Sequence, residues 1–266
     1  MKIGFIGVGN MGSAIMKAVL TCVDAKNVYI ADANKERINA LSQSYGTNAS
    51  TNVEIASVCD YIFLGVKPQV MADMLSDISK TLAARNTRFV LISMAAGLEI
   101  KTLLSYLDND YPIIRIMPNL PVSVGEGMTL FDSVGVEESE INEFCSFMKN
   151  TGKLLHLPEH LIDAGCSVSG CGPAFVCLMI EAMSDAGVKC GLPRATATTL
   201  ATQTLLGTSK LISETETHPA ALKDAVCSPG GSTIAGVEAL ENNTFRSAVI
   251  NAVAESYKRN IELGKK

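Results

Sequence analysis

The sequence Lys2-Ile3-Gly4-Phe5-Ile6-Gly7-Val8-Gly9-Asn10-Met11-Gly12 carries the strongest structural signal in this chain. Its first half is short, apolar and rich in isoleucine, which predicts a buried strand. Its second half is Gly-x-Gly-x-x-Gly, and residues 13–20 have the composition of a helix. In that context the glycines allow a tight turn, a close approach of the backbone to a pyrophosphate, and close helix–strand packing. We therefore predict that the helix N-terminus binds a dinucleotide through Gly7, Gly9, Asn10, Met11 and Gly12.

An acidic residue follows this turn at the distance expected for ribose binding. Residues 27–32 predict a second strand, and Asp32 lies at its carboxyl end, twenty residues after Gly12. A carboxylate at this place can bond a ribose 2′-hydroxyl. Asp32 could equally cap the next predicted helix, residues 34–45, which ends at Gly46. Both roles are open at this point.

Strands and helices alternate up to residue 157 and no further. The remaining strands are predicted at residues 60–66, 89–93, 113–117 and 153–157. This alternation is typical of a mostly parallel, doubly wound sheet. Later residues predict only helices, at 174–186, 194–213, 219–226, 233–241 and 245–263. We therefore predict an α/β fold with a Rossmann-type dinucleotide-binding domain over residues 1–157 and an all-helical substrate-binding and dimerisation domain over residues 158–266.

The composition limits the classes of partner. The chain has 266 residues, a net charge of −5 and no basic patch, so we expect neither nucleic acid nor an anionic membrane as a partner. The predicted C-terminal helices are more apolar than one small domain can bury, and residues 195–206 carry no charge. We therefore expect a homodimer formed through this domain.

The cysteines indicate the compartment. There are eight of them, none in a Cys-x-x-Cys pattern and most in apolar stretches, where a free thiol behaves as a small hydrophobe. The first predicted strand starts at the N-terminus, so we expect no signal peptide before it. Together these features predict a reduced, cytoplasmic protein.

Three loops lie where ligands bind. Lys67-Pro68 and Ala95-Ala96-Gly97 follow predicted strands at the carboxyl edge of the sheet. Lysine could meet a ribose or phosphate and the small residues could accommodate a flat ring, although either segment could be an ordinary turn. Ser228-Pro229-Gly230-Gly231-Ser232-Thr233 precedes a helix, where successive N–H groups can hold a small carboxylate. The alternative is a plain helix cap formed by Ser232 or Thr233.

Two patterns that look catalytic are rejected. His156-Leu157-Pro158-Glu159-His160 matches a zinc motif that needs both histidines on one helix, and Pro158 interrupts that helix. Gly165-Cys166-Ser167-Val168-Ser169 lacks the closing glycine of a nucleophile elbow and follows a helical stretch. We expect no metal site and no serine-hydrolase chemistry.

Taken together, the motifs resemble the pyrroline-5-carboxylate reductase family over essentially the whole chain. The segments that carry the resemblance in the first half are the glycine-rich turn, Val66-Lys67-Pro68, Ala95-Ala96-Gly97 and Met117-Pro118-Asn119. Those in the second half are Val168-Ser169-Gly170, Pro173-Ala174, Glu181-Ala182, His218-Pro219, Leu222-Lys223-Asp224 and residues 227–233. The last run is the most specific.

The resemblance implies an activity and a set of site residues. It implies NAD(P)H-dependent reduction of 1-pyrroline-5-carboxylate to L-proline, the last step of proline biosynthesis, by hydride transfer to a cyclic imine. It also implies an interleaved homodimer of the helical domains, which in the family is often assembled further into a decamer. The cofactor residues implied beyond the glycine-rich turn and Asp32 are Asn52, Val66, Lys67, Pro68, Ala95, Ala96 and Gly97. The substrate residues implied are Glu216, Ser228, Gly230, Gly231, Ser232 and Thr233, with the Thr233 hydroxyl as the catalytic group that relays a proton to the ring nitrogen.

Two other functions and the choice of cofactor remain open in the sequence. The chain could reduce another small imino or keto acid, or it could be a non-catalytic, dinucleotide-binding redox sensor. The carboxylate loop favours an enzyme, because a sensor does not need one. Asp32 favours NAD over NADP, because a carboxylate bonds a ribose diol but repels a 2′-phosphate. Lys35 and Arg37 lie nearby and could offset part of that repulsion.

Overall fold

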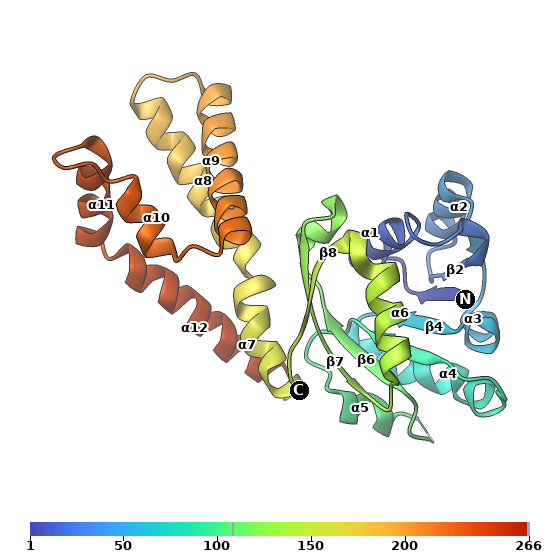
Figure 1. The fold of residues 1–266 in the computed structure, drawn as a ribbon. Helices are drawn as coiled ribbons and strands as arrows, with labels where there is room; N and C mark the ends of the chain where they lie inside the picture. Colours follow the sequence, from blue (N-terminus) through green and yellow to red (C-terminus); the bar gives the residue numbers. More distant parts are fainter. Residues whose placement is uncertain (108, 265–266) are drawn as a thin grey trace. The chain divides into compact units, whose positions relative to one another are not determined.

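The protein is described by a computed structural model that covers residues 1–107 and 109–264, and the chain forms two compact units (Figure 1). The first unit comprises Met1–Gly170 together with the chain from Tyr257 onward, and the second comprises Cys171–Ser256. Residues 265 and 266, the last two of the predicted helical domain, lie outside the described residues.

The first unit is built on one eight-stranded sheet with the order β3-β2-β1-β4-β5-β6-β7-β8. Its strands are β1 (Ile3–Ile6), β2 (Val28–Ala31), β3 (Asn48–Ala49), β4 (Tyr61–Leu64), β5 (Val90–Ser93), β6 (Ile113–Met117), β7 (Gly127–Val134) and β8 (Gly152–His156). Neighbouring strands are parallel except β6 and β7, which are antiparallel. The order reverses between β1 and β4, which places the expected ligand crevice at the carboxyl ends of these two strands.

Helices cover both faces of the sheet (Figure 1), which confirms the predicted doubly wound α/β fold. The helices of this unit are α1 (Asn10–Val19), α2 (Lys35–Tyr45), α3 (Asn52–Val58), α4 (Met71–Ala83), α5 (Ile100–Ser105), α6 (Glu138–Met148) and α7 (Glu159–Ser169). Successive residues of a strand face opposite sides of the sheet, and each side has its own core. On one side the rings of Phe5 and Phe63 stack with their centroids 4.4 Å apart, in the core under α1 and α6. Ile62 and Leu64 face the opposite core, with α3, α4 and α5.

Two strands, β3 and β7, are not predicted by the sequence pattern. β3 is only two residues long and β7 mixes polar with apolar residues without regular alternation. A polar residue is tolerated in β7 because it has internal partners: the Asp132 carboxylate accepts the backbone N–H of Glu159 at 2.7 Å and contacts His156 Nε2 at 3.1 Å. β7 is therefore stabilised by tertiary contacts that the local sequence pattern does not show.

The second unit is helical, as predicted. Its helices are α8 (Gly172–Lys189), α9 (Arg194–Thr215), α10 (Pro219–Ala225), α11 (Ser232–Asn242) and α12 (Phe245–Gly264), of which the last turns of α12 belong to the first unit. Among residues 171–256 only Ser184, Ala197 and Ala201 are buried. Large apolar side chains such as Leu178 and Ile250 are about two-thirds exposed, at 64% and 65%. Such helices need a covering surface.

The run from Glu159 to Lys189 is long and apolar enough to cross a membrane, judged by length and composition alone. The same test is passed by apolar helices that pack against protein, so this is weak evidence for a membrane span. α7, the first part of this run, packs on the sheet through Ile162, which lies in a small core with Met117 and Leu130.

Secondary structure and compactness divide the chain at different places. The mixed pattern of strands and helices ends with β8 at His156, close to the predicted division at residue 158. The compact units separate later, after Gly170, because α7 packs on β6 and β7. A functional division between residues 157 and 158 stays a prediction.

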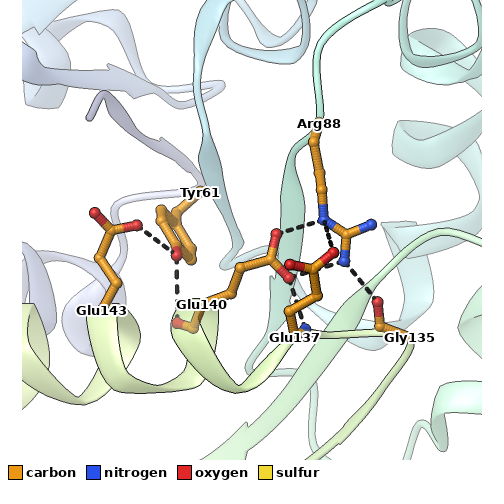
Figure 2. Close-up of polar contacts among 6 residues, drawn as sticks. All are labelled: Tyr61, Arg88, Gly135, Glu137, Glu140 and Glu143. Carbon is orange, nitrogen blue, oxygen red and sulfur yellow. Dashed lines mark hydrogen bonds and ion pairs between the residues drawn. The ribbon is translucent and has the colours of Figure 1, made fainter.

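A polar network holds the N-terminus of α6 at the edge of the sheet where β4 and β5 begin (Figure 2). Glu137 caps α6, and its N–H donates to the Glu140 carboxylate at 2.8 Å, which completes a capping box. The same carboxylate accepts two bonds from the Arg88 guanidinium, at 2.6 and 2.9 Å. Arg88 also donates to the Gly135 carbonyl at 2.9 Å, so a single side chain joins β5, β7 and α6.

Tyr61 extends this network into the core. Its hydroxyl donates to the Glu143 carboxylate at 2.7 Å, and its ring packs edge-on against Phe147 with the centroids 5.0 Å apart. Burial first, and the Glu143 carboxylate second, raise the pKa of Tyr61. Because the network lies at the amino ends of the strands, opposite the ligand edge, we assign it a structural role.

The charge of Glu140 generates a prediction about acid stability. The Arg88 guanidinium lowers the pKa of Glu140 below its usual value, so this carboxylate stabilises the fold above its unfolded pKa and loses that effect as the pH falls. Glu140→Gln can keep the acceptor for the helix cap, but it removes the charge and the second acceptor oxygen, to which Arg88 Nε donates. We expect it to cost about 0.5–1 kcal/mol at neutral pH, since Arg88 is half exposed, and almost nothing near pH 3.

Urea unfolding of both proteins at several pH values measures this difference. A cost of Glu140→Gln that does not change between neutral and acidic pH would show that the ion pair contributes nothing.

Candidate cofactor and substrate sites

The three glycines of the first turn have different structural roles. Gly7 has φ +96°, and a Cβ there would lie 2.6 Å from the Gly65 carbonyl, so only glycine fits between β1 and β4. A Cβ at Gly12 would collide with the Gly7 carbonyl oxygen, which fixes how closely α1 approaches β1. A Cβ at Gly9 would have no atom of the chain within 4 Å. Gly9 is also the N-cap of α1 and provides no side-chain acceptor to its first N–H groups, which are therefore free to bind an anion.

The cavity at the ends of β1 and β4 brings together residues predicted from separate parts of the chain. It has a volume of about 620 Å³. The predicted cofactor residues that line it are Gly7, Gly9, Asp32, Asn52, Val66 and Lys67. Asn10 and Met11 lie in the first turn of α1, and Met11 packs against the core. Arg37 follows from the sequence only as a charge near Asp32. In the structure both residues line the cavity.

Asp32 ties the glycine-rich turn to the end of β2. One carboxylate oxygen accepts the N–H of Val8 at 2.9 Å, and the other accepts the N–H of Asn34 at 2.9 Å. The guanidinium of Arg37 lies 3.6 Å from the same carboxylate. The alternative that Asp32 caps the following helix is wrong, because Asn34 is the N-cap of α2 and its side chain accepts the N–H of Arg37. A role for Asp32 toward a ribose stays a prediction.

A second, smaller pocket continues along the same edge of the sheet. It has a volume of about 220 Å³ and is lined by the predicted residues Pro68, Ala96 and Gly97. Lys67 lines the first cavity and its neighbour Pro68 lines the second, so consecutive residues contribute to both spaces. Ala95, the third residue of the predicted small-residue segment, is buried in the core beneath this pocket.

The loop before α11 has free backbone donors. α11 begins at Ser232, and its N-cap is Gly231, which has no side chain to cap the helix. The alternative in which Ser232 or Thr233 caps this helix is therefore wrong. Gly230 adopts φ +68°, and the N–H of Gly231 donates to the Ser228 carbonyl at 3.0 Å. The first N–H groups of α11 are left without a side-chain acceptor, which suits a carboxylate.

Glu216 has an unusual backbone conformation in the same unit. It is the C-cap of α9 with φ +52°, a left-handed conformation that is uncommon for any residue except glycine. Its N–H donates to the Ile212 carbonyl at 2.9 Å, which helps to hold it there. A left-handed residue is a common way to end a helix, and a role for Glu216 near the substrate loop stays a prediction.

The histidine pattern has no geometry for zinc. His156 ends β8 and contacts Asp132, whereas His160 lies in the first turn of α7, beyond Pro158. Among residues 1–107 and 109–264 no group of three or more His, Cys, Asp or Glu side chains is placed to hold a metal ion.

A doubly wound sheet, a glycine-rich turn at its switch point and a second helical unit define a dinucleotide-binding oxidoreductase fold. Comparison with known families makes this more specific. The family model for pyrroline-5-carboxylate reductase dimerisation matches residues 159–263, and the one for NADP oxidoreductase, coenzyme F420-dependent, matches residues 2–97. The chain belongs to the pyrroline-5-carboxylate reductase family.

Relatives from several organisms support this membership. The pyrroline-5-carboxylate reductase of Synechocystis sp. is 42% identical and covers 100% of this chain and 99% of its own. The pyrroline-5-carboxylate reductase of Escherichia coli is 38% identical, and the match covers 99% of this chain and 98% of its own. Among solved structures, Plasmodium falciparum pyrroline carboxylate reductase with NADP bound is 32% identical, with a TM-score of 0.87 and coverage of 99% and 98%.

The glycine geometry predicts that one glycine-to-alanine substitution lowers stability and that another lowers affinity for the dinucleotide. Gly12→Ala forces a Cβ against the Gly7 carbonyl and should lower the free energy of unfolding by about 1–3 kcal/mol. Gly9→Ala meets no atom of the chain and should change that free energy by less than about 1 kcal/mol. The Gly9→Ala Cβ occupies the space where a pyrophosphate approaches the turn, so the Kd for the dinucleotide should rise by at least about 10-fold.

Denaturant unfolding and calorimetric titration measure the two quantities. If Gly9→Ala bound the cofactor as tightly as wild type, the pyrophosphate would not lie against this turn.

Proposed function

We propose that this protein reduces 1-pyrroline-5-carboxylate to L-proline with a reduced nicotinamide dinucleotide, the last step of proline biosynthesis. The observation that carries the proposal is that both halves of such a site occur in one chain of this family. The cavity at Gly7 and Gly9 suits a dinucleotide, and the uncapped N-terminus of α11 suits the carboxylate of a small substrate.

The residues of the second unit would orient the substrate and protonate its nitrogen. The free N–H groups at the start of α11, with the hydroxyls of Ser228 and Ser232, would hold the substrate carboxylate, and Glu216 would line the same pocket. The Thr233 hydroxyl would bond the ring nitrogen and relay a proton. Water or a previously protonated iminium would supply that proton, since a hydroxyl is too weak an acid to be its source. No covalent nucleophile is needed, and positioning supplies most of the rate.

The residues of the first unit would hold the cofactor. The free N–H groups of α1 and the space over Gly9 fit a pyrophosphate, while Asp32 and Asn52 line the part of the cavity suited to a ribose. Val66, Lys67 and Pro68 lead toward Ala96 and Gly97 in the smaller pocket. A reduced nicotinamide, when bound, supplies the hydride for the imine carbon.

The alternatives differ in what they require of the substrate loop. A reductase of another small imino or keto acid would use the same carboxylate site. A redox sensor would bind the dinucleotide without using the free donors of α11. Oxidation of the reduced cofactor, followed by its absorbance with pyrroline-5-carboxylate and with small keto acids, separates the three. No consumption above background with pyrroline-5-carboxylate would overturn the proposal.

The role of Thr233 can be tested in the same assay. Thr233→Ala removes the positioned donor and should lower kcat by up to about 10²–10³-fold. Thr233→Ser keeps the hydroxyl and should retain most of the activity. The Kd of the cofactor should be nearly unchanged in both, because Thr233 belongs to the second unit. Wild-type turnover in Thr233→Ala would remove this residue from the mechanism.

We infer that the cofactor is NADP or NAD, with a preference for NAD that comes from Asp32. The Asp32 carboxylate lines the cavity, where its charge opposes a 2′-phosphate, while Arg37 beside it offsets part of this effect. The relative from Plasmodium falciparum has NADP bound, so the family includes a member that binds NADP. The balance between Asp32 and Arg37 then sets the preference.

Two substitutions should move this preference in opposite directions. Asp32→Asn removes the charge and keeps one of the two acceptors of the turn, so the ratio of kcat/KM for NADPH to that for NADH should rise by about 10-fold. Arg37→Ala should lower the ratio, because it leaves the carboxylate unopposed. Steady-state kinetics with both cofactors measures each ratio. If Asp32→Asn leaves the ratio unmoved, Asp32 only holds the glycine-rich turn.

The helical unit supports a homodimer as the working assembly. Its match to a dimerisation family and its exposed apolar helices both favour a second copy of the chain as the covering surface. A decamer, the absence of nucleic-acid and membrane partners, and a cytoplasmic location remain part of the proposal. No disulfide joins the eight cysteines within residues 1–107 and 109–264, which is compatible with a reducing compartment.

A further inference from the structure

The smaller pocket has a wall that the motifs of the family do not include. Opposite Ala96 and Gly97 it is lined by Asp163 and Cys166 of α7 and by Asn260 and Leu263 of α12. These residues all belong to the first compact unit, because α12 returns to it from Tyr257 onward. The end of α12 therefore lies beside α7 next to the ligand edge of the sheet (Figure 1).

Asn260 is held in one orientation in this wall. Its Nδ2 donates to the backbone carbonyl of Asp163 at 3.2 Å. None of the described residues donates a hydrogen bond to its Oδ1, and the side chain is partly buried. The next turn of α12 approaches closely: a Cβ on Gly97 would lie 3.6 Å from the Gly264 Cα. An acceptor of fixed direction therefore lines a pocket floored by small residues.

The neighbouring helix is held firmly by a buried arginine. Arg115 of β6 is 1% exposed, and its guanidinium lies 3.1 Å from the Glu159 carboxylate and 3.5 Å from that of Asp163. Glu159 also accepts the N–H of Ile100 at 2.7 Å. These contacts fix the first turns of α7 on the sheet, and they fix the Asp163 carbonyl to which Asn260 donates.

We propose that Asn260 is a specificity-determining residue for the cofactor, with its Oδ1 accepting a hydrogen bond from the NH₂ group of the nicotinamide carboxamide. The inference rests on the proposed function. Pro68, Ala96 and Gly97 would bound the ring, and a dinucleotide in the larger cavity would reach this pocket past the consecutive residues Lys67 and Pro68. A carboxamide needs one partner that accepts and one that donates, and Asn260 supplies the acceptor.

The test uses the oxidised 3-acetylpyridine analogue of the cofactor, in which a methyl group replaces the carboxamide NH₂. Calorimetric titration gives the Kd of this analogue and of the natural dinucleotide. Wild type should prefer the natural dinucleotide by about 10-fold, roughly the effect of one hydrogen bond. In Asn260→Ala, and in Asn260→Leu, which keeps the side-chain volume, this preference should fall to about equal binding.

Asn251→Ala is the matched control, since Asn251 lies on the same helix in the second unit, where its side chain donates to the Ser247 hydroxyl at 3.5 Å. It should keep the wild-type preference. The proposal is overturned if wild type binds both dinucleotides equally, if the Asn260 variants keep the preference, or if they weaken both dinucleotides by the same factor.

Failure of the proposed function gives a different result. A wild type that shows the Asn260-dependent preference and yet does not reduce pyrroline-5-carboxylate would leave this inference standing and remove the substrate assignment.

Discussion

The close packing of β1, α1 and β4 around glycines is the constraint on which the rest of the site depends. Gly7 can pass beside Gly65 only because neither has a side chain, and α1 can approach β1 only because Gly12 lacks a Cβ. This packing directs the uncapped N-terminus of α1 toward the carboxyl edge of the sheet, at the reversal of strand order. A dipole and free N–H groups at that edge are what a pyrophosphate needs.

Asp32 stabilises the same turn from the other side. Its two bonds to backbone N–H groups fix the glycine-rich turn to the end of β2. If Asp32 also binds a ribose, as proposed, a substitution at this position changes structure and specificity together. The sequence motif points to the acid, but it does not reveal the bonds by which this side chain holds the turn.

Long, strongly patterned elements could be predicted from the sequence. The helices of the second unit begin and end within a few residues of their predicted bounds, because proline and glycine mark their ends, as Pro219 and Gly231 do. β7 was missed because its polar residue Asp132 is paired with α7, a contact that no local pattern contains. Asn260 could not be predicted as a pocket residue for the same reason, because it lines the pocket through the return of α12 to the first unit.

The candidate site was partly predictable for a similar reason. Backbone positions that require glycine leave a signature in the sequence, so Gly7 and Gly12 could be assigned from spacing. Side chains that act through tertiary contacts leave none. Both capping alternatives, Asp32 for α2 and Ser232 or Thr233 for α11, were reasonable from composition. They failed because Asn34 and Gly231 occupy the cap positions.

The central claim is that two helix N-termini without a side-chain cap bind the two ligands. The N-terminus of α1 binds the cofactor, and that of α11 binds the substrate carboxylate. Hydrogen–deuterium exchange of the full-length protein tests it most directly. The oxidised dinucleotide should slow exchange of the amides of residues 8–13, and L-proline added to that complex should slow those of residues 231–235. Protection by proline outside the start of α11, with no change there, would contradict the account.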